Sequence, residues 1–228
     1  MQVPFEFEFQ NGHTFASFFV GNNDEIVTQL EGMAQDGPEQ QIYLWGEEGC
    51  GKSHLLQACC QHAQTLGKLP FYLKLDVQQL PDVQILNGLE DYELVCLDDI
   101  HTVAGNQKWE EGLFGFYNAH RQNNHHLLLA ANTPPQYLTF ELPDLKTRMS
   151  WGLTLKIHPL REEQLIEAMT RKAHNLGFDL PVTVGRFLLR HYVQDLPAMW
   201  QLLEKIDRAT LAEKRKLTIP FLKQILKE

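Results

Sequence analysis

Gly46-Glu47-Glu48-Gly49-Cys50-Gly51-Lys52-Ser53 is the stretch of this sequence that decides the fold. It matches the template of a phosphate-binding loop, in which a glycine and four free residues precede Gly-Lys and then Ser or Thr. The glycines let successive backbone N–H groups point into one concavity, and Lys52 adds a positive charge for the outer phosphates. The Ser53 hydroxyl suits a magnesium ion. A helix that starts at Ser53 adds its positive dipole end to the same anion.

The residues on either side of the loop support this interpretation. The apolar run 42–45 is typical of a buried strand that leads into the loop. After the loop, apolar residues recur at helical spacing, at Leu55, Leu56, Cys59, Cys60 and Ala63. The alternative is a glycine-rich turn that happens to precede a lysine, and the strand and helix on either side disfavour it.

The composition places the chain among globular proteins. It has 228 residues, 43% of them hydrophobic, which is enough for a medium α/β domain and a small appendage. The formal net charge of −9 argues against nucleic acid as the main partner, although a local basic patch is compatible with it. No apolar run approaches the length of a membrane span and no leader opens the sequence, so we expect a cytoplasmic protein without membrane contact.

The order of the predicted elements indicates the fold class. Apolar runs at 42–45, 71–75, 94–97, 127–131 and 153–157 predict strands, and a helical pattern covers 109–120. This alternation implies an α/β domain with a parallel sheet covered by helices on both faces. From about residue 160 only helical patterns follow, which predicts a small helical domain. We therefore divide the chain into an N-terminal segment, 1–22, an α/β domain, 23–158, and a helical domain, 159–228.

Polar residues follow the predicted third and fourth strands. Asp98 and Asp99 come directly after the run 94–97, where a carboxylate can hold magnesium beside a phosphate loop. Asp98 is the candidate metal ligand, and Asp99 is a candidate for orienting a water molecule. The alternative is a pair of solvated loop acids. Asn132 follows the fourth strand and is a candidate sensor of the outer phosphate, although Asn before two prolines is equally typical of a turn.

Arg148 precedes the predicted fifth strand, in the run Leu145-Lys146-Thr147-Arg148. An exposed arginine there can reach a neighbouring subunit's nucleotide and stabilise charge on a phosphoryl group in transfer. On its own, an arginine in a loop is more often a solvated charge.

Taken together, these positions resemble the AAA+ ATPases and, more narrowly, the DnaA/Hda family. The resemblance includes Leu145–Arg148, which looks like the family's arginine-finger segment, and the C-terminal runs 185–189 and 215–221. It also includes the stretch 14–22, which in such proteins packs near the nucleotide base. By this resemblance the candidate nucleotide-binding residues, beyond the phosphate loop, are Phe18, Phe19, Val20, His54 and Asn132.

The resemblance implies an AAA+ domain with a five-stranded parallel sheet and a helical lid. It also implies a bound adenine nucleotide, ADP or ATP, with Mg²⁺. Hda-type members act with the DNA-loaded sliding clamp of DNA polymerase III and stimulate ATP hydrolysis by DnaA, which inactivates the initiator. Arg148 would then act in trans, on DnaA or within a homo-oligomer. No sequence-specific DNA binding is expected, because no basic helix-turn-helix segment follows the lid. The alternative is an autonomous DnaA-like or helicase-loader ATPase, and whether the chain hydrolyses ATP itself stays open.

Two stretches depart from the family pattern. Clamp-binding peptides of Hda-type proteins usually have a Gln followed by alternating aliphatic residues, and this chain offers only Gln2 and Phe5 in the run 2–7. Alternating Phe and Glu there is equally compatible with an edge strand. In the helical domain, the run 195–200 lacks the arginine that the family places near the start of the third lid helix as a second sensor.

Overall fold

The computed structural model describes residues 12–192, 196–213 and 215–226. The chain divides between His158 and Pro159 into two compact units, an α/β unit and a helical unit. The candidate clamp-binding residues Gln2 and Phe5 lie outside the described residues. Among the residues that are described, no helix is long and apolar enough to cross a membrane.

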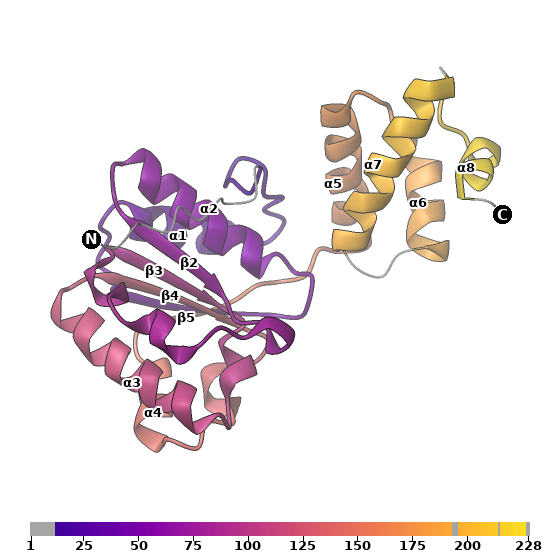
Figure 1. Cartoon of the computed structure of the whole chain (residues 1–228). Helices are drawn as coiled ribbons and strands as arrows, with labels where there is room; N and C mark the ends of the chain where they lie inside the picture. Colours follow the sequence, from indigo (N-terminus) through magenta and orange to yellow (C-terminus); the bar gives the residue numbers. More distant parts are fainter. Residues whose placement is uncertain (1–11, 193–195, 214, 227–228) are drawn as a thin grey trace. The chain divides into compact units, whose positions relative to one another are not determined.

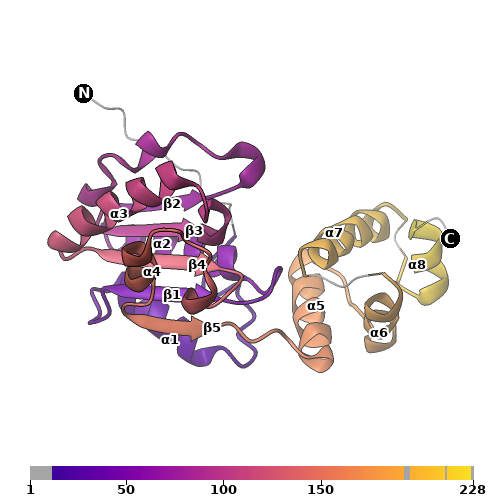
Figure 2. The same cartoon turned by 90° about the horizontal axis from the view of Figure 1, so that it is seen from below.

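In the part of the chain that the structure describes, the α/β unit contains one sheet of five parallel strands, in the order β2-β3-β4-β1-β5. Figure 2 shows the strands in this order. Their bounds are Gln41–Trp45 for β1, Pro70–Lys74 for β2, Leu94–Asp98 for β3, His126–Ala131 for β4 and Leu153–Lys156 for β5. The predicted α/β fold with five parallel strands is therefore confirmed. The first strand lies inside the sheet, between β4 and β5, so the loop that follows it is flanked by other strand ends.

Helices cover both faces of this sheet (Figure 1). Ile42 and Leu44 point to the face covered by α1 (Asp24–Ala34) and α2 (Lys52–Thr65). Tyr43 points to the opposite face, where it packs with residues of α3 (Gln107–Gln122) and α4 (Pro143–Met149). Successive side chains of a strand alternate between faces. Because each face is covered, the strands are apolar on both sides, as the continuous apolar runs predicted.

Among its described residues, the helical unit is a bundle of four helices with its own apolar core, in agreement with the predicted lid. The helices are α5 (Glu162–Leu176), α6 (Val182–His191), α7 (Leu196–Glu213) and α8 (Ile219–Leu226). Met169, Leu188, Leu203 and Phe221 are among the buried residues of this core. Gly185 of α6 packs near Ile166 of α5, and a Cβ there would make an ordinary van der Waals contact at 3.6 Å.

Two helices of the α/β unit were not predicted. In α1, Ile26, Leu30 and Met33 have helical spacing and are buried. The sequence therefore did contain the apolar periodicity that predicts this helix. The second is α4, whose seven residues begin with Pro143. It is too short to show a periodic pattern, and the segment around Arg148 was interpreted as a loop. It is a helix, which changes how Arg148 is held.

The buried His120 predicts a loss of stability in acid. Its side chain is 1% exposed and Nε2 has no hydrogen-bond partner among the described residues. Burial, with a smaller effect of His125, lowers the pKa of His120 to about 4. As pH falls, His120 therefore takes up a proton in the unfolded chain before it does so in the folded protein. The contribution of neutral His120 to the free energy of unfolding is fully present above about pH 6.5 and is lost as pH falls from 6.5 to 4. When the pH is lowered from 7 to 4.5, we expect the free energy of unfolding of the wild type to fall by about 2 kcal/mol more than that of His120→Leu. Urea unfolding of both proteins at the two pH values measures this difference, and an equal loss would contradict it.

Candidate nucleotide-binding site

The candidate nucleotide-binding residues meet at the carboxyl edge of the sheet. Gly46 follows β1 and Asn132 follows β4, and the preceding residues Trp45 and Ala131 are paired in the ladder. Asp98 ends β3 on the other side of β4. Asn132 is exposed there, next to the phosphate loop. Ligands of open α/β sheets bind at this edge.

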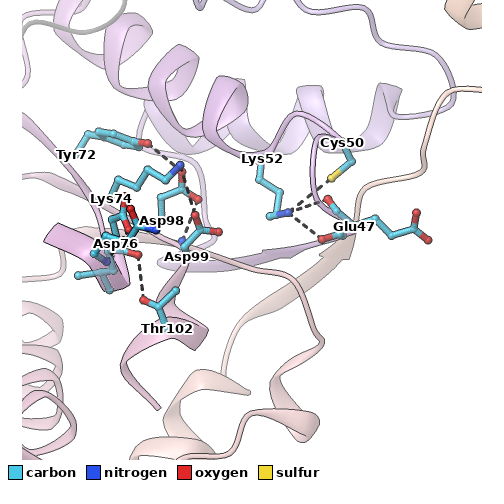
Figure 3. Close-up of polar contacts among 12 residues, drawn as sticks. Glu47, Cys50, Lys52, Tyr72, Lys74, Asp76, Asp98, Asp99 and Thr102 are labelled. Carbon is cyan, nitrogen blue, oxygen red and sulfur yellow. Dashed lines mark hydrogen bonds and ion pairs between the residues drawn. The ribbon is translucent and has the colours of Figure 1, made fainter. Parts of the chain in front are cut away.

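The phosphate loop holds Lys52 at the first position of α2. Its Nζ donates hydrogen bonds to the carbonyl oxygens of Gly46 and Glu47, both at 2.9 Å, and the residue is 7% exposed. Figure 3 shows the lysine curled over the loop, with Cys50 beside it. These contacts hold the ammonium over the loop, and the first backbone N–H groups of α2 have no partner within the helix. This arrangement can bind a polyphosphate through both charge and backbone donors.

Gly51 is required for the shape of the loop. It caps α2 with a φ of 102°, a conformation that side-chain-bearing residues rarely adopt. A Cβ at this position would also lie 2.8 Å from Cε2 of Phe18. The buried Phe18 ring therefore packs directly against the loop backbone.

Asp98 is a buried carboxylate with several donors. Tyr72 donates from its hydroxyl to Oδ2 at 2.9 Å, and the backbone N–H of Asp99 donates to Oδ1 at 3.0 Å. Burial raises the pKa of Asp98 above its usual value, and hydrogen bonds from Ser53 and Tyr72 act in the opposite direction. The structure thus brings together the predicted carboxylate and hydroxyl, which are oxygen donors of the kind that Mg²⁺ prefers.

A cation at this site would need further oxygen ligands. Among the described residues, no group of three or more His, Cys, Asp or Glu side chains could hold a metal ion. Ser53 and Asp98 fit a magnesium ion that also takes its ligands from phosphate oxygens and water.

Asp99 has a different environment from Asp98. Its φ is 56°, in the left-handed region, and its Oδ2 lies 3.7 Å from Nζ of Lys74 at the end of β2. Figure 3 shows Lys74 and Asp99 next to the buried Asp98. A positive φ at a residue other than glycine is uncommon and is found at functional sites. The conformation of Asp99 is therefore compatible with a functional role at the carboxyl edge of the sheet.

The segment before α1 is attached to the first turns of α2. Nε2 of His54 lies 2.9 Å from the carbonyl oxygen of Thr14 and 3.2 Å from Oγ of Ser17. The His54 ring also stacks on His13, which contacts Gln57 in the next turn. His54 therefore positions the segment that carries Phe18, Phe19 and Val20. Phe19 and Val20 are half-buried, in contrast to the buried Phe18.

Arg148 is not part of this edge. Gln41, the first residue of β1, donates from Nε2 to the carbonyl oxygen of Arg148 at 3.0 Å. The phosphate loop follows the last residue of the same strand, Trp45, which is about 13 Å farther along at 3.3 Å per residue. Arg148 thus lies toward the amino edge of the sheet.

The guanidinium of Arg148 is held against aromatic rings. Its Cζ lies 3.8 Å from the centroid of Phe114 and 5.8 Å from that of Tyr117, both on α3. Nη1 is buried and has no hydrogen-bond partner within the described residues. The side chain is half-buried, whereas the sequence predicted an exposed arginine. The Arg148 side chain thus keeps one donor without a partner among the described residues.

Sequence reasoning did not identify Tyr72, Gln41 or Glu110. The sequence offers only a weak indication for Tyr72, which is that its position in β2 places it on the sheet face covered by α2. Glu110 lies on the face of α3 that contains Leu113 and Tyr117, so an acid within an apolar stripe was visible. The contacts of Gln41 involve residues more than 70 positions away, and no local pattern predicts them.

Comparison with known families covers both units of the chain. A sequence model described as the bacterial DnaA ATPase domain matches residues 9–156. A second one, described as the lid domain of Hda, matches residues 162–226. The first match alone spans more than half of the 228 residues.

Solved structures share the fold at low sequence identity. Domain III of the replication initiation protein DnaA from Thermotoga maritima is similar with a TM-score of 0.80 and 19% identity, covering 96% of this chain and 97% of that chain. AMPPCP-bound DnaA from Aquifex aeolicus gives a TM-score of 0.75 and 21% identity, with 87% of this chain and 66% of that chain covered. The Holliday junction branch migration motor RuvB of Thermotoga maritima gives 0.66 and 16%, with 90% and 68% covered.

Proposed function

Because this chain belongs to the family of the bacterial DnaA ATPase domain and carries a lid of the Hda type, we propose that it is a nucleotide-bound regulator of DnaA. In this proposal it acts with the DNA-loaded sliding clamp and stimulates hydrolysis of the ATP that DnaA holds. DnaA then changes to its inactive form, and initiation of chromosomal replication is restrained.

The observation that carries this proposal is the position of Arg148. The backbone of Arg148 lies toward the amino edge of the sheet and its guanidinium stacks on Phe114 of α3, whereas the chain's own phosphate loop lies at the carboxyl edge. In the proposed function, this arginine would serve a nucleotide bound to another molecule. Its charge would stabilise the transferring phosphoryl group, as an activating protein does for a GTPase. The other molecule is DnaA, and a second copy of this chain is the alternative.

The phosphate loop has a supporting part in this proposal. Gly46, Gly49, Cys50, Gly51 and Lys52 would bind the phosphates of ADP or ATP, with Asn132 near the outermost one. Ser53 and Asp98 would hold Mg²⁺, and Phe18, Phe19 and Val20 would lie near the base, in a segment positioned by His54. AMPPCP bound to the DnaA of Aquifex aeolicus supports a nucleotide on this fold. Clamp binding would fall to Gln2 and Phe5, and its support is the family resemblance alone.

Asp99 gives the alternative function, an autonomous ATPase, a specific basis. An acid beside the candidate magnesium ligand can orient an attacking water. Two reactions separate the alternatives, one with the chain, ATP and Mg²⁺, and one with added DnaA and DNA-loaded clamp. The proposed regulator gives fast turnover only in the second. Equal turnover in both, abolished by Lys52→Ala, would support the autonomous enzyme.

Replacing Asp99 by Asn should leave the stimulation of DnaA within about twofold of wild type. Asn tolerates the left-handed backbone as Asp does, and the change removes only the carboxylate charge. Any slow ATP turnover by the chain alone should disappear, because the variant lacks the acid proposed to orient water. Steady-state phosphate release with and without DnaA measures both effects. A large loss of stimulation in Asp99→Asn would mean that hydrolysis by this chain is part of its action.

A further inference from the structure

The helix that carries Arg148 is held at both ends by buried polar side chains. It has only seven residues, and a helix of that length is unstable in isolation. Its conformation therefore depends on contacts with the rest of the α/β unit. Two of these contacts come from residues that none of the candidate sites includes.

Glu110 of α3 holds the amino-terminal end of α4. Its Oε2 accepts the backbone N–H of Leu142, the N-cap of α4, at 2.7 Å. Its Oε1 accepts the N–H groups of Glu141 at 3.1 Å and Gly105 at 2.7 Å. Glu110 is 2% exposed, and a carboxylate buried to this degree is costly unless donors such as these satisfy it.

Gln41 of β1 holds the carboxyl-terminal end. Its Nε2 donates to the carbonyl oxygens of Arg148 at 3.0 Å and of Met149 at 3.3 Å. Its Oε1 accepts a hydrogen bond from the Tyr117 hydroxyl at 2.8 Å, and the Tyr117 hydroxyl accepts one from Nη1 of Arg121 at 3.1 Å. The orientation of the Gln41 amide is thus set by a chain of hydrogen bonds, and Gln41 is 6% exposed.

The backbone around Gln41 leaves little freedom. Gly152, which follows α4 and precedes β5, has a φ of 81°, and a Cβ there would lie 2.3 Å from the carbonyl oxygen of Gln41. The segment that leaves α4 is therefore packed directly against the first residue of β1. Helix, turn and strand form one unit around the carbonyl groups of Arg148 and Met149.

We infer that Gln41 and Glu110 are positioning residues for Arg148. They bind the backbone at the two ends of α4 and leave the guanidinium to exchange the Phe114 ring for a partner's phosphate. A fixed backbone limits that movement to the side chain, so less order has to be gained when the guanidinium engages the transferring phosphoryl group. This inference rests on the proposed function of Arg148.

The test uses Gln41→Leu and Glu110→Gln, with Glu111→Gln as the matched control. Glu111 is the exposed neighbour of Glu110 on the same helix, and its side chain accepts a hydrogen bond from Gln107. We expect each variant of a positioning residue to lower the maximal stimulation of DnaA hydrolysis about tenfold, whereas the concentration for half-maximal stimulation changes less than twofold. Amide hydrogen exchange should accelerate in 143–150 and stay unchanged in 52–65.

A third variant and a double mutant distinguish a loss of positioning from a loss of folding and from an error in the role of Arg148. Tyr117→Phe removes one hydroxyl from the support of Gln41, so it should give a smaller loss of the same kind in a folded protein. In the Arg148→Ala background, Gln41→Leu should cause no further loss. If Arg148→Ala reduces stimulation and Gln41→Leu does not, the positioning inference is wrong and the proposed function stands. If Arg148→Ala has no effect, the proposed finger role of Arg148 fails, and faster exchange in 143–150 would then report only a structural contact.

Discussion

Arg148→Ala should abolish the stimulation of DnaA's ATP hydrolysis, with a loss on the order of 1,000-fold, the usual contribution of an arginine finger. The guanidinium lies outside the chain's own nucleotide site, so nucleotide binding by the variant should stay within about twofold of wild type. The change also removes the stacking on Phe114, which contributes about 1 kcal/mol. Hydrolysis by DnaA in the presence of loaded clamp, with nucleotide affinity of the chain measured in parallel, tests both statements.

Arg148→Lys is the matched control for charge. Lysine keeps the positive charge but loses the planar fork that binds phosphate oxygens in pairs and that stacks on a ring. We expect it to recover only a small part of the activity. Full activity in Arg148→Lys would show that a point charge is sufficient. Full activity in Arg148→Ala would remove the finger from the account.

Lys52→Ala should weaken binding of ADP and ATP at least about 100-fold. The Lys52 ammonium is held over the loop by two carbonyl groups, and a charge-assisted contact to phosphate in a site closed to water contributes several kcal/mol. The nucleotide should then no longer stabilise the fold. At a concentration 100 times the dissociation constant, that stabilisation amounts to about 2.7 kcal/mol in wild type.

Thermal unfolding with and without ADP measures this effect. Lys108→Ala, which changes an exposed lysine on α3, is the control and should respond to ADP as wild type does. The melting temperature of Lys52→Ala without nucleotide shows whether the freed carbonyl groups destabilise the loop. An ADP-induced shift in Lys52→Ala equal to that of wild type would exclude the loop as the nucleotide site.

Local sequence patterns were sufficient to place the candidate residues at the carboxyl edge of the sheet. Lys52 and Ser53 follow one apolar strand, Asp98 ends another and Asn132 follows a third. Because carboxyl ends of parallel strands meet at one edge, residues far apart in sequence were expected to converge. The order of the strands was not accessible, since the pairing of β1 with β4 and β5 depends on crossover connections rather than on any pattern within a strand.

The surroundings of Arg148 were less accessible to prediction. The finger segment was identified by resemblance, but its helix is too short to give a periodic signal. Of its supports, Gln41 looks like an ordinary polar residue before a strand. Glu110 is visible as an acid within an apolar helix stripe, but no local pattern indicates its partners. Their roles arise from contacts with 148–149 and 141–142, which only tertiary structure brings together.

The most direct test is single-turnover cleavage of labelled ATP that is bound to DnaA beforehand. The chain is loaded with unlabelled ADP, so that its own site contributes no cleavage, and DNA-loaded clamp is present. We expect the labelled ATP to be cleaved much faster with wild type than with Arg148→Ala or with no added chain. Equal rates in the three reactions would contradict the claim that this protein completes the nucleotide site of DnaA.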